Sequence, residues 1–577
     1  MKKESNEFLG LLCNMYLVAM LVVLPLYTGQ GYWQLGDTKY RLFYNVSLLC
    51  VGVWMIFGIP AQVQAAVGRR KQEAAVDPHR AAPKWTEYFG GFSGTDFAVA
   101  CYGVCVLLSA VCSSYGRLAW TGYSGWYMGA IVQLLFVGLY FFVSRQYDGA
   151  RWPLYLAEAA FFVVSVLGLL HRLGIDPLGL LDGWNSGDWE YSHMLSTLGN
   201  INWLCGYYSV VLAFSIAHFL REEKRWLRIV LYVVSVAALV VLWIQGSQGG
   251  LLIVGVCAAC CVWTGRRDVA VLRKVCLLFA GSFLCLPVME LLMKLRGKKA
   301  AVVRDGNIFG SVRWYVWIIA GLFCLLLFFL LARVKLPFRH KRGNAERREG
   351  TVASFWQKCG RKQRAICGML AIVGAGIGIF LMCRLAVNRL DDGFGSGRVF
   401  LWRIAIQNVE EAGLKDKLIG AGPDCYAEAV FNRMAAGTDM WQGEHWDGSV
   451  FTNAHNEFLS QLCNVGILGT VSYLAIFLTA LYACYGNIRR GDDGAGNWLG
   501  LLAAVMYGAH SLVSFQQVLN TPLLFLTLAI SEAMRRRQDG QRTSQEEKGT
   551  AQEENSRIVT GVTAEEKSMR SSKRERV

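Results

Sequence analysis

The 577-residue sequence is poor in charge, since only 17% of its residues are Asp, Glu, Lys or Arg whereas 54% are hydrophobic. This balance excludes a chain of ordinary soluble domains, in which about 25% of residues are charged. Also missing are the ~10-residue alternating segments of a transmembrane β-barrel. The apolar residues instead form runs of about 18 to 23, long enough to cross a hydrocarbon layer of about 30 Å as helices. The sequence therefore predicts an all-α polytopic transmembrane bundle.

Other absences narrow the function further. No Cys-x-x-Cys pair recurs, and the 18 cysteines lie mostly in apolar runs, where Cys behaves as a small hydrophobe. We therefore expect no metal site. No small-x-small cleavage site follows the first apolar run, 8–27, so it is interpreted as an uncleaved helix rather than a signal peptide. No repeat with a fixed period is found.

About fourteen spans are predicted from the apolar runs. The first eleven and their connections form a bundle over 1–387, the last three lie within 459–534, and the polar segment 388–458 separates the two groups. Residues 535–577 lack aromatic side chains and predict a disordered tail. The predicted spans are 8–27, 43–60, 95–112, 126–144, 153–171, 199–220, 226–244, 248–263, 274–293, 314–334, 365–387, 459–485, 497–515 and 519–534.

The net charge of +16 arises mostly between the apolar runs. We interpret it as the excess of positive charge on cytoplasmic loops and not as a nucleic-acid-binding surface. With the amino terminus inside, most basic loops and both termini become cytoplasmic, and segment 388–458 becomes extracytoplasmic. The basic loop 294–313 is the exception. Glu158 lies inside an apolar run, where an ionisable group is by default a functional hypothesis.

Segment 388–458 is too long for a simple connection, and long folded loops often carry function. Its apolar spacing after Arg398 predicts an amphipathic helix against the membrane or the bundle. A second short helix is predicted over 424–434, and Gly and Pro at 420–423 separate the two. The segment is plausible as a lid over an outward-facing cavity. Its histidines are His445 and His455.

Three blocks stand out in the second half of the chain. They are Gly397-Arg398-x-x-x-Trp402, then Leu418-Ile419-Gly420-Ala421-Gly422-Pro423, and Asn453-Ala454-His455-Asn456-Glu457-Phe458-Leu459 with Gly466-Ile467-Leu468-Gly469. In their order and spacing, these blocks resemble the O-antigen ligase and O-antigen polymerase superfamily of bacterial envelope glycan enzymes. Two weaker resemblances to the same superfamily are Gly199-Asn200-Ile201-Asn202 and His510-Ser511-Leu512-Val513.

The resemblance implies an integral membrane enzyme of bacterial surface polysaccharide biosynthesis, with a fold related to the C-type glycosyltransferases. Such an enzyme transfers a glycan from a polyprenyl (undecaprenyl) diphosphate carrier to an acceptor hydroxyl, at the outer face of the cytoplasmic membrane. It needs no metal, cofactor or nucleotide sugar. Both a ligase and a polymerase use the same residues, so the resemblance does not choose between them, nor does it identify the sugar or the acceptor.

The same resemblance implies that His455 accepts the proton of the acceptor hydroxyl and that Arg398 helps to hold the diphosphate. Independent chemistry agrees, because imidazole suits a general base and guanidinium groups stabilise a developing diphosphate charge. We predict that His455 and Arg398 are catalytic. The predicted substrate-binding residues are Asn202, Gln248, Arg384, Arg403, Asn456 and His510.

One departure from the family pattern concerns Gln248. The family commonly has Ser-Arg-Gly where this chain has Ser247-Gln248-Gly249, so one charge for the diphosphate is missing. We hypothesise that Arg384 or the basic loop 294–313 replaces it. Two alternatives stay open: a transporter or flippase of lipid-linked saccharide, for which paired halves with broken helices are typical, and an inactive glycan-binding relative.

Overall fold

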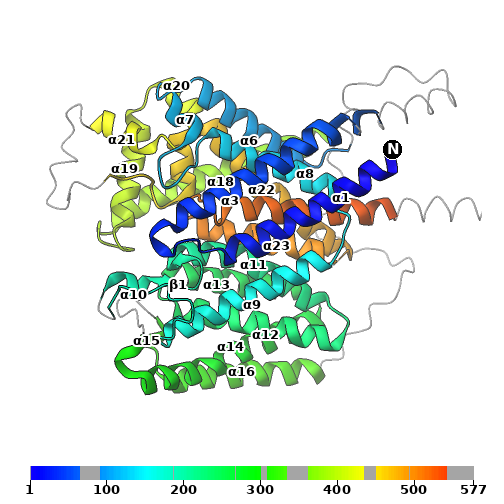
Figure 1. The fold of residues 1–577 in the computed structure, drawn as a ribbon, viewed down its shortest axis with the longest axis vertical. Coiled ribbons are helices and arrows are strands. Elements are labelled where there is room, and N and C mark those ends of the chain that lie inside the picture. The colour runs from blue at the N-terminus through cyan, green and yellow to red at the C-terminus, as the bar shows by residue number, and fades with distance from the viewer. Residues whose placement is uncertain are drawn as a thin grey trace, which may run out of the picture.

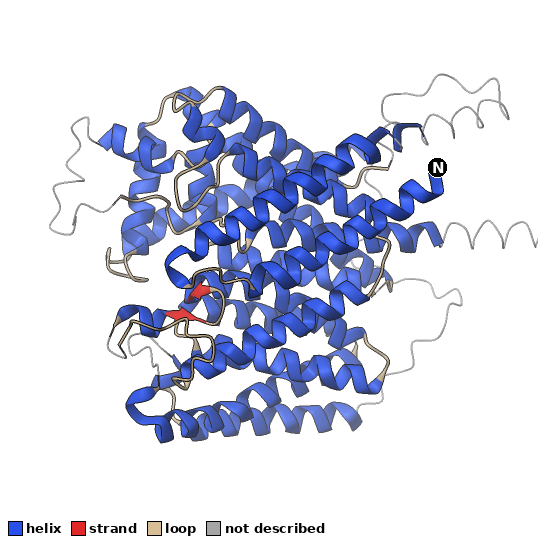
Figure 2. Ribbon diagram, viewed as in Figure 1, coloured by secondary structure: helices blue, strands red, loops and turns tan. Residues whose placement is uncertain are grey.

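The computed structural model describes residues 2–60, 62–64, 91–185, 188–266, 268–300, 308–333, 361–434, 450–492 and 494–541. Most of this part of the chain is helical, as Figure 2 shows. The strands in it are β1 (Met194–Leu195) and β2 (Gly199–Asn200), an antiparallel pair in which Met194 lies opposite Asn200. The predicted all-α class is therefore confirmed for the described residues.

Ten helices in the described ranges are long and apolar enough to cross a membrane, which makes the chain a multi-pass membrane protein. The first consists of α1 (Lys2–Val18), η1 (Ala19–Val23) and α2 (Leu24–Leu26), and the second of η2 (Tyr32–Gln34), α3 (Leu35–Val53) and η3 (Trp54–Gly58). The others are α6 (Gly94–Val111), α9 (Trp152–Arg172), α11 (Ile201–Arg221), α12 (Arg225–Ile244), α13 (Gln248–Gly265), α14 (Val269–Arg296), α16 (Trp314–Arg333) and α22 (Glu457–Arg490).

The four remaining predicted spans also coincide with helices, but these are not among the ten. They are α8 (Ala130–Gln146), α18 (Arg361–Arg389), α23 (Ala495–Ser511) and a helix over 521–541. Two of them, α8 and α23, have only 17 residues. Each predicted span therefore corresponds to a helix, and the number that crosses the membrane stays a prediction.

Successive helices alternate in direction, so their connections gather at two ends of the bundle (Figure 1). One end carries α7 (Arg117–Thr121), α10 (Trp189–His193), η4 (Gly297–Lys299), α15 (Ile308–Ser311) and the segment after α18. We call it the site end. The amino terminus and the last turn of helix 521–541 lie at the opposite end, the terminus end.

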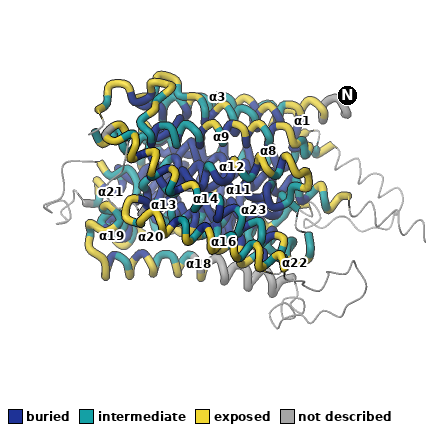
Figure 3. Tube along the Cα trace, turned by 90° about the horizontal axis from the view of Figure 1, so that it is seen from below, coloured by how far each residue is buried: buried dark blue, intermediate teal, exposed yellow. Residues whose placement is uncertain are grey.

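Helix α11 is the central element of the bundle. It is apolar around its whole circumference, and 89% of its membrane-spanning window is buried. Such a helix is stable only when other helices surround it. Helices α9, α12, α13 and α23 pack against it, and Figure 3 shows the buried residues concentrated in the middle of the bundle. Because α11 spans the bundle, its first turn and its last turn contribute to opposite ends.

The segment between α18 and α22 folds onto the bundle. It contains α19 (Arg398–Glu411), α20 (Leu414–Ile419) and α21 (Tyr426–Met434). The two predicted short helices are thus confirmed, the second beginning two residues later than expected, while α20 was not predicted. Val399, Ile404 and Ile406 of α19 pack with Tyr426 of α21 and with apolar residues of α18 and α22. Residues 435–449, which include His445, lie outside the described part.

Two glycines allow this segment to contact a kink in α22. Gly466 has φ +67° inside α22, a conformation that favours glycine. The N–H groups of Ala421 and Gly422 donate to the carbonyl oxygens of Cys463 and Asn464 over 3.0 and 2.9 Å. A Cβ on Gly420 would lie only 2.2 Å from the Asn464 oxygen. The block 418–423 is therefore fixed to the helix that follows His455.

The helix over 521–541 corrects the predicted start of the disordered tail. It passes Arg535 without interruption, and Arg535 and Arg536 form ion pairs with Glu532 and Asp96. The pattern of charged residues at 535–541 therefore belongs to an ordered helix end and not to a tail. Residues 542–577 lie outside the described ranges.

Candidate active site

Four helix amino termini converge at the site end. Helices α11, α13 and α19 begin there, and His455 precedes the first residue of α22 by two positions. Asn200, Ser247 and Asn456 cap three of these helices through side-chain oxygens that accept backbone N–H groups. Each amino terminus carries a partial positive charge. Together they favour an anion in the space that they surround.

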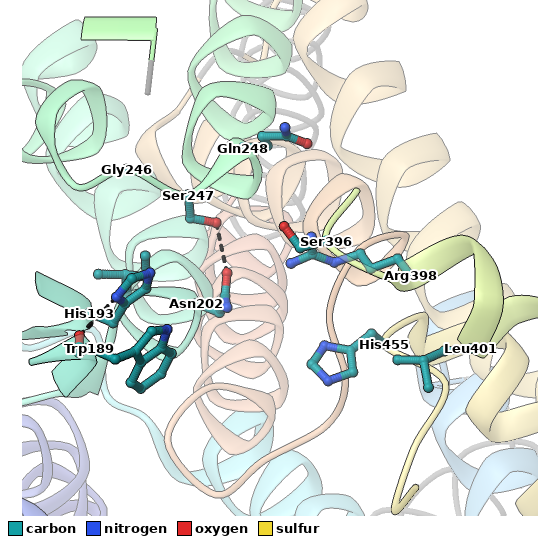
Figure 4. A pocket seen from close by; sticks show the side chains of 11 residues that line it. Trp189, His193, Asn202, Gly246, Ser247, Gln248, Ser396, Arg398, Leu401 and His455 are labelled. Carbon is teal, nitrogen blue, oxygen red and sulfur yellow. Dashed lines mark hydrogen bonds between the residues drawn. The ribbon is translucent and has the colours of Figure 1, made fainter. Parts of the chain in front are cut away.

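A cavity of about 400 Å³ occupies this space (Figure 4). His455 and Arg398 lie on one side of it, Trp189 and His193 on the other, and Asn202 and Ser247 between them. No carboxylate is among the described side chains that line it. The lining residues are Trp189, His193, Ile201, Asn202, Gly246, Ser247, Gln248, Ser396, Arg398, Leu401 and His455.

Arg398 is the cation of the cavity. It is the first residue of α19, after Gly397 in the left-handed conformation with φ +81°. Its Nε donates to the carbonyl oxygen of Val513 over 3.1 Å and its Nη1 to that of Gly395 over 2.7 Å. These two bonds fix the guanidinium group, and Nη2 has no acceptor in the described part of the chain. Burial lowers the pKa of Arg398 from its very high ordinary value, and the group stays charged.

His455 lines the same cavity as Arg398. Its backbone N–H donates to Asn453 Oδ1 over 3.0 Å, and its φ of +45° turns the chain just before α22. The edge of its ring packs on Phe515 with 4.9 Å between the centroids. Within the described residues, no side chain or carbonyl bonds to either ring nitrogen. Burial and then the charge of Arg398 lower the pKa of His455 to about 4, so the imidazole is neutral at pH 7.

Asn202 and Gln248, both predicted to bind substrate, also line the cavity. Ser247 Oγ donates to Asn202 Oδ1 over 2.7 Å, and this bond joins the starts of α11 and α13. Gln248 is exposed to the cavity and has no hydrogen-bond partner among the described residues. Its amide is therefore available to a ligand at the amino terminus of α13.

Trp189 and His193 also line the cavity, although the sequence did not predict them as site residues. They belong to α10, in the connection between α9 and α11, and their rings stack at 4.3 Å with an interplanar angle of 6°. Trp189 is 53% exposed, and burial lowers the pKa of His193. The signal that could have found them is the unusual density of aromatic residues in this otherwise polar connection, Trp184, Trp189, Tyr191 and His193.

A second, more apolar cavity of about 230 Å³ adjoins the first and shares Gln248 and Arg398 with it. Most of its other lining residues are apolar or glycine. They come from α13, from α19, from the connection before α19 and from the connection after α23. These residues are Gly249, Leu252, Phe394, Gly395, Val399, Trp402 and Val513.

Four predicted substrate-binding residues lie outside both cavities. Arg384 pairs with Glu410, and Arg403 with Asp392 over 2.6 Å. Asn456 is fully buried and caps α22 by accepting the N–H of Leu459 over 3.1 Å. His510 is buried behind Gly249, where a Cβ would lie 3.5 Å from its ring. The structure therefore gives these residues positions that support the fold near the site, without direct contact with the cavity.

Gln248 stands where the resembling superfamily has an arginine, and no basic side chain replaces that charge at the cavity among the described residues of loop 294–313 or at Arg384. Lys294 pairs with Glu290 over 2.5 Å, and Arg296 donates to the carbonyl oxygens of Leu173 and Gly174 over 2.9 and 3.2 Å. Arg384 is occupied by Glu410, and Arg304 lies outside the described ranges. Positive potential around Gln248 therefore comes from Arg398 and the four helix termini.

Two buried carboxyl groups, those of Asp424 and Glu457, tie the residues around the site to neighbouring parts of the bundle. Asp424 accepts the backbone N–H groups of Tyr123 and Met128 over 2.7 and 2.9 Å, which ties the 423–425 turn to the connection between α6 and α8. Burial raises the pKa of Asp424 to about 7, although both N–H groups lower it. Glu457 accepts Ser511 Oγ over 2.9 Å and the hydroxyl of Tyr473. Both act at the margin of the site, and the sequence alone did not indicate either.

No family model matches this chain, and no curated protein matches it significantly.

Proposed function

We propose that the chain is a glycosyltransferase of the O-antigen ligase type. It would transfer a glycan from a polyprenyl diphosphate to an acceptor hydroxyl at the outer face of a bacterial cytoplasmic membrane, with the site end outside and both termini in the cytoplasm. The observation that carries the proposal is that His455 and Arg398, which the resemblance implies as base and diphosphate ligand, line the same cavity. The multi-pass bundle also supports the proposal, because the polyprenyl carrier of the donor is itself bound to the membrane.

The donor diphosphate lies between Arg398 and the start of α13 in this proposal. Guanidinium forms charge-assisted hydrogen bonds with phosphate oxygens, and Arg398 has one terminal nitrogen available. The amino termini of α11, α13 and α19 add positive potential in a cavity whose described lining contains no carboxylate. Gln248 donates hydrogen bonds from the position where the family has an arginine. The polyprenyl chain leaves through the adjoining apolar cavity.

His455 acts as general base. The acceptor oxygen attacks the anomeric carbon of the donor sugar, its proton passes to a ring nitrogen of His455, and the anomeric C–O bond breaks with its electron pair going to the polyprenyl diphosphate. Arg398 and the helix termini stabilise that leaving group. Without donor, burial and Arg398 hold the pKa of His455 near 4. A bound diphosphate offsets the charge of Arg398, so the pKa of His455 rises in the complex and the imidazole becomes a better base.

The test is His455→Ala in cells that depend on this chain for a stainable surface polysaccharide. The expected result is loss of the finished polysaccharide, with the lipid-linked donor accumulating on the outer face, where an added glycosidase digests it in whole cells. Arg489→Gln at the terminus end serves as the control and keeps the polysaccharide. Donor that accumulates on the cytoplasmic face would overturn transfer in favour of a flippase, and unchanged polysaccharide would overturn both.

A further inference from the structure

A third cavity, of about 490 Å³, lies at the terminus end and is separate from the two cavities of the site end. It is formed where four elements meet: the turn before α9 with the first residues of that helix, the last turn of α11 with the residues after it, the start of α23, and the last turns of helix 521–541. The lining residues are Tyr147, Gly149, Arg151, Leu154, Tyr155, His218, Arg221, Glu222, Glu223, Lys224, Ala495, Met534, Arg537, Gln538 and Gln541. The proposed sugar transfer makes no use of it.

The cavity carries an excess of cations. Four Lys or Arg side chains line it, Arg151, Arg221, Lys224 and Arg537, against two carboxylates. One of these, Glu222, already accepts the backbone N–H groups of Glu223 and Lys224 over 3.0 and 2.9 Å. In the described part of the chain, the side chains of Arg151, Lys224 and Arg537 have no acceptor. An anion in this cavity would supply one.

Arg537 is held at the cavity by its surroundings. It follows Arg535 and Arg536, which are committed to Glu532 and Asp96. Gly149, with φ +83°, faces Arg537, and a Cβ there would lie 3.1 Å from the arginine Nε. The turn around Gly149 is itself fixed, because Asp148 accepts the side chain of Asn14 over 3.1 Å and the N–H of Ala150 over 2.8 Å. A larger residue at position 149 would press on the guanidinium group of Arg537 and would be strained by the positive φ.

His218 extends the cavity toward the buried carboxylate that the sequence singled out. Its Nδ1 lies 3.2 Å from Glu158 Oε1, and Ser215 donates to the other carboxylate oxygen. The side chain of Glu158 is only 5% exposed and that of His218 15%. The Glu158 hypothesis thus acquires a location. This carboxylate orients a histidine that lines the cavity, and no hydrogen bond occupies the other ring nitrogen within the described residues.

We infer that this cavity binds a phosphate-bearing anion. Arg151, Lys224 and Arg537 surround the phosphate, and Arg forms paired hydrogen bonds with phosphate oxygens. Two sources share this chemistry: the headgroup of an anionic phospholipid in the adjoining leaflet and a free phosphate or diphosphate from solution. Anionic lipids are attracted to basic clusters at helix ends in the same way. The inference does not depend on sugar transfer, since its site lies at the opposite end of the bundle.

The experiment compares a double variant, Arg151→Gln with Arg537→Gln, with a charge-matched control, Arg266→Gln with Arg489→Gln. The control arginines lie at the same end but stack on Trp263 and Tyr485, away from the cavity. The first probe is inorganic pyrophosphate, measured by equilibrium dialysis of the full chain in an uncharged detergent. The second is phosphatidylglycerol, counted by native mass spectrometry after release from phosphatidylcholine nanodiscs with about one fifth phosphatidylglycerol.

The expected result is a loss of about tenfold in affinity for at least one probe in the cavity variant, equivalent to about 1.4 kcal/mol, with no loss in the control. Loss of pyrophosphate binding identifies a soluble ligand, and loss of retained phosphatidylglycerol alone identifies a lipid headgroup. Lys224→Gln, an exposed single substitution, must lower binding of the same probe if the double variant does not fold. Equal binding of both probes by the cavity and control variants overturns the inference.

Discussion

The two polar cavities are of similar volume, about 400 and about 490 Å³, but they are built differently. At the site end, four helices begin around one half-buried arginine and one half-buried histidine. At the terminus end, two helices begin and two end, so their dipoles oppose one another, and exposed side chains carry the charge. The backbone itself therefore favours an anion at the site end, whereas at the terminus end only side chains do. The first arrangement suits chemistry, and the second suits binding that salt weakens.

The largest expected loss of activity follows from removing the histidine of the site-end cavity, whereas substitutions in the terminus-end cavity should affect transfer less. His455→Gln keeps a polar side chain and removes the base, so we expect kcat for transfer to fall about 100-fold or more, because general base catalysis contributes about 10² to 10⁴ in rate. The KM for the donor should stay within about twofold, since the diphosphate ligands remain. Steady-state transfer kinetics of the purified chain with its lipid-linked donor give both values. A larger loss from the Arg151 and Arg537 double variant than from His455→Gln would reverse the assigned roles.

Arg398→Gln is the next largest test. Removing the charge that faces the leaving diphosphate should lower kcat/KM about 10- to 100-fold, somewhat less than for a typical oxyanion donor because the helix termini remain. Gln248→Arg in the same background should recover part of the loss, since it adds a positive charge at the start of α13. Donor titration and kcat/KM of the single and double variants measure this. Arg403→Gln, which loses the exposed pair with Asp392 and a hydrogen bond to the Val387 carbonyl oxygen, is the matched control, and equal losses in the two arginine variants would remove Arg398 from the site.

Trp189→Ala should have a moderate effect. The exposed face of Trp189 suits the C–H face of a sugar ring, so we expect KM for one glycan substrate to rise about five- to tenfold while kcat changes little. Trp226→Ala provides the control, because Trp226 is similarly exposed, at 65%, near the start of α12 at the terminus end. A fall in kcat without a change in KM would contradict the role of a sugar platform.

The pH dependence links the two charged groups of the site. In the free protein the acid limb of kcat/KM should lie near the pKa of His455, about 4, because free-enzyme groups control this parameter. Arg398→Gln removes one of the two causes that lower this pKa, so the limb should move to higher pH, though not to the ordinary value of 6.5 because burial remains. The acid limb of kcat should also lie above that of kcat/KM, since bound diphosphate offsets Arg398. An unmoved limb in Arg398→Gln would show that the two groups do not interact.

The sequence predicted those features that depend on local pattern. Apolar runs located every long helix of the bundle, and the blocks around Arg398 and His455 contain two of the residues that line the cavity. It did not predict Trp189 and His193, because the aromatic residues of their connection do not by themselves show that the connection folds beside the starts of α13 and α19. Arg384 and Arg403 were predicted to bind substrate, but they lie outside the cavities. Each forms an ion pair with a nearby carboxylate, on α19 and in the turn after α18 respectively. Spacing along the chain does not reveal such competition.

The role of Asp424 was likewise not predicted from the sequence. Its substitution gives the smallest predicted effect, a change in melting temperature. Its raised pKa means that the folded chain keeps a proton that the unfolded chain releases, so this contribution to stability is complete below pH 4 and is lost as the pH rises to about 7. Asp424→Asn keeps an acceptor for the N–H groups of Tyr123 and Met128 and tolerates the φ of +59°, but it does not ionise. We expect its melting temperature to exceed that of the unaltered chain by a few degrees at pH 8 and not at pH 4.5. Asp424→Ala, which loses the acceptor, should melt lower at both pH values, and a gain for Asp424→Asn that is the same at both would refute a titrating carboxyl group at this turn.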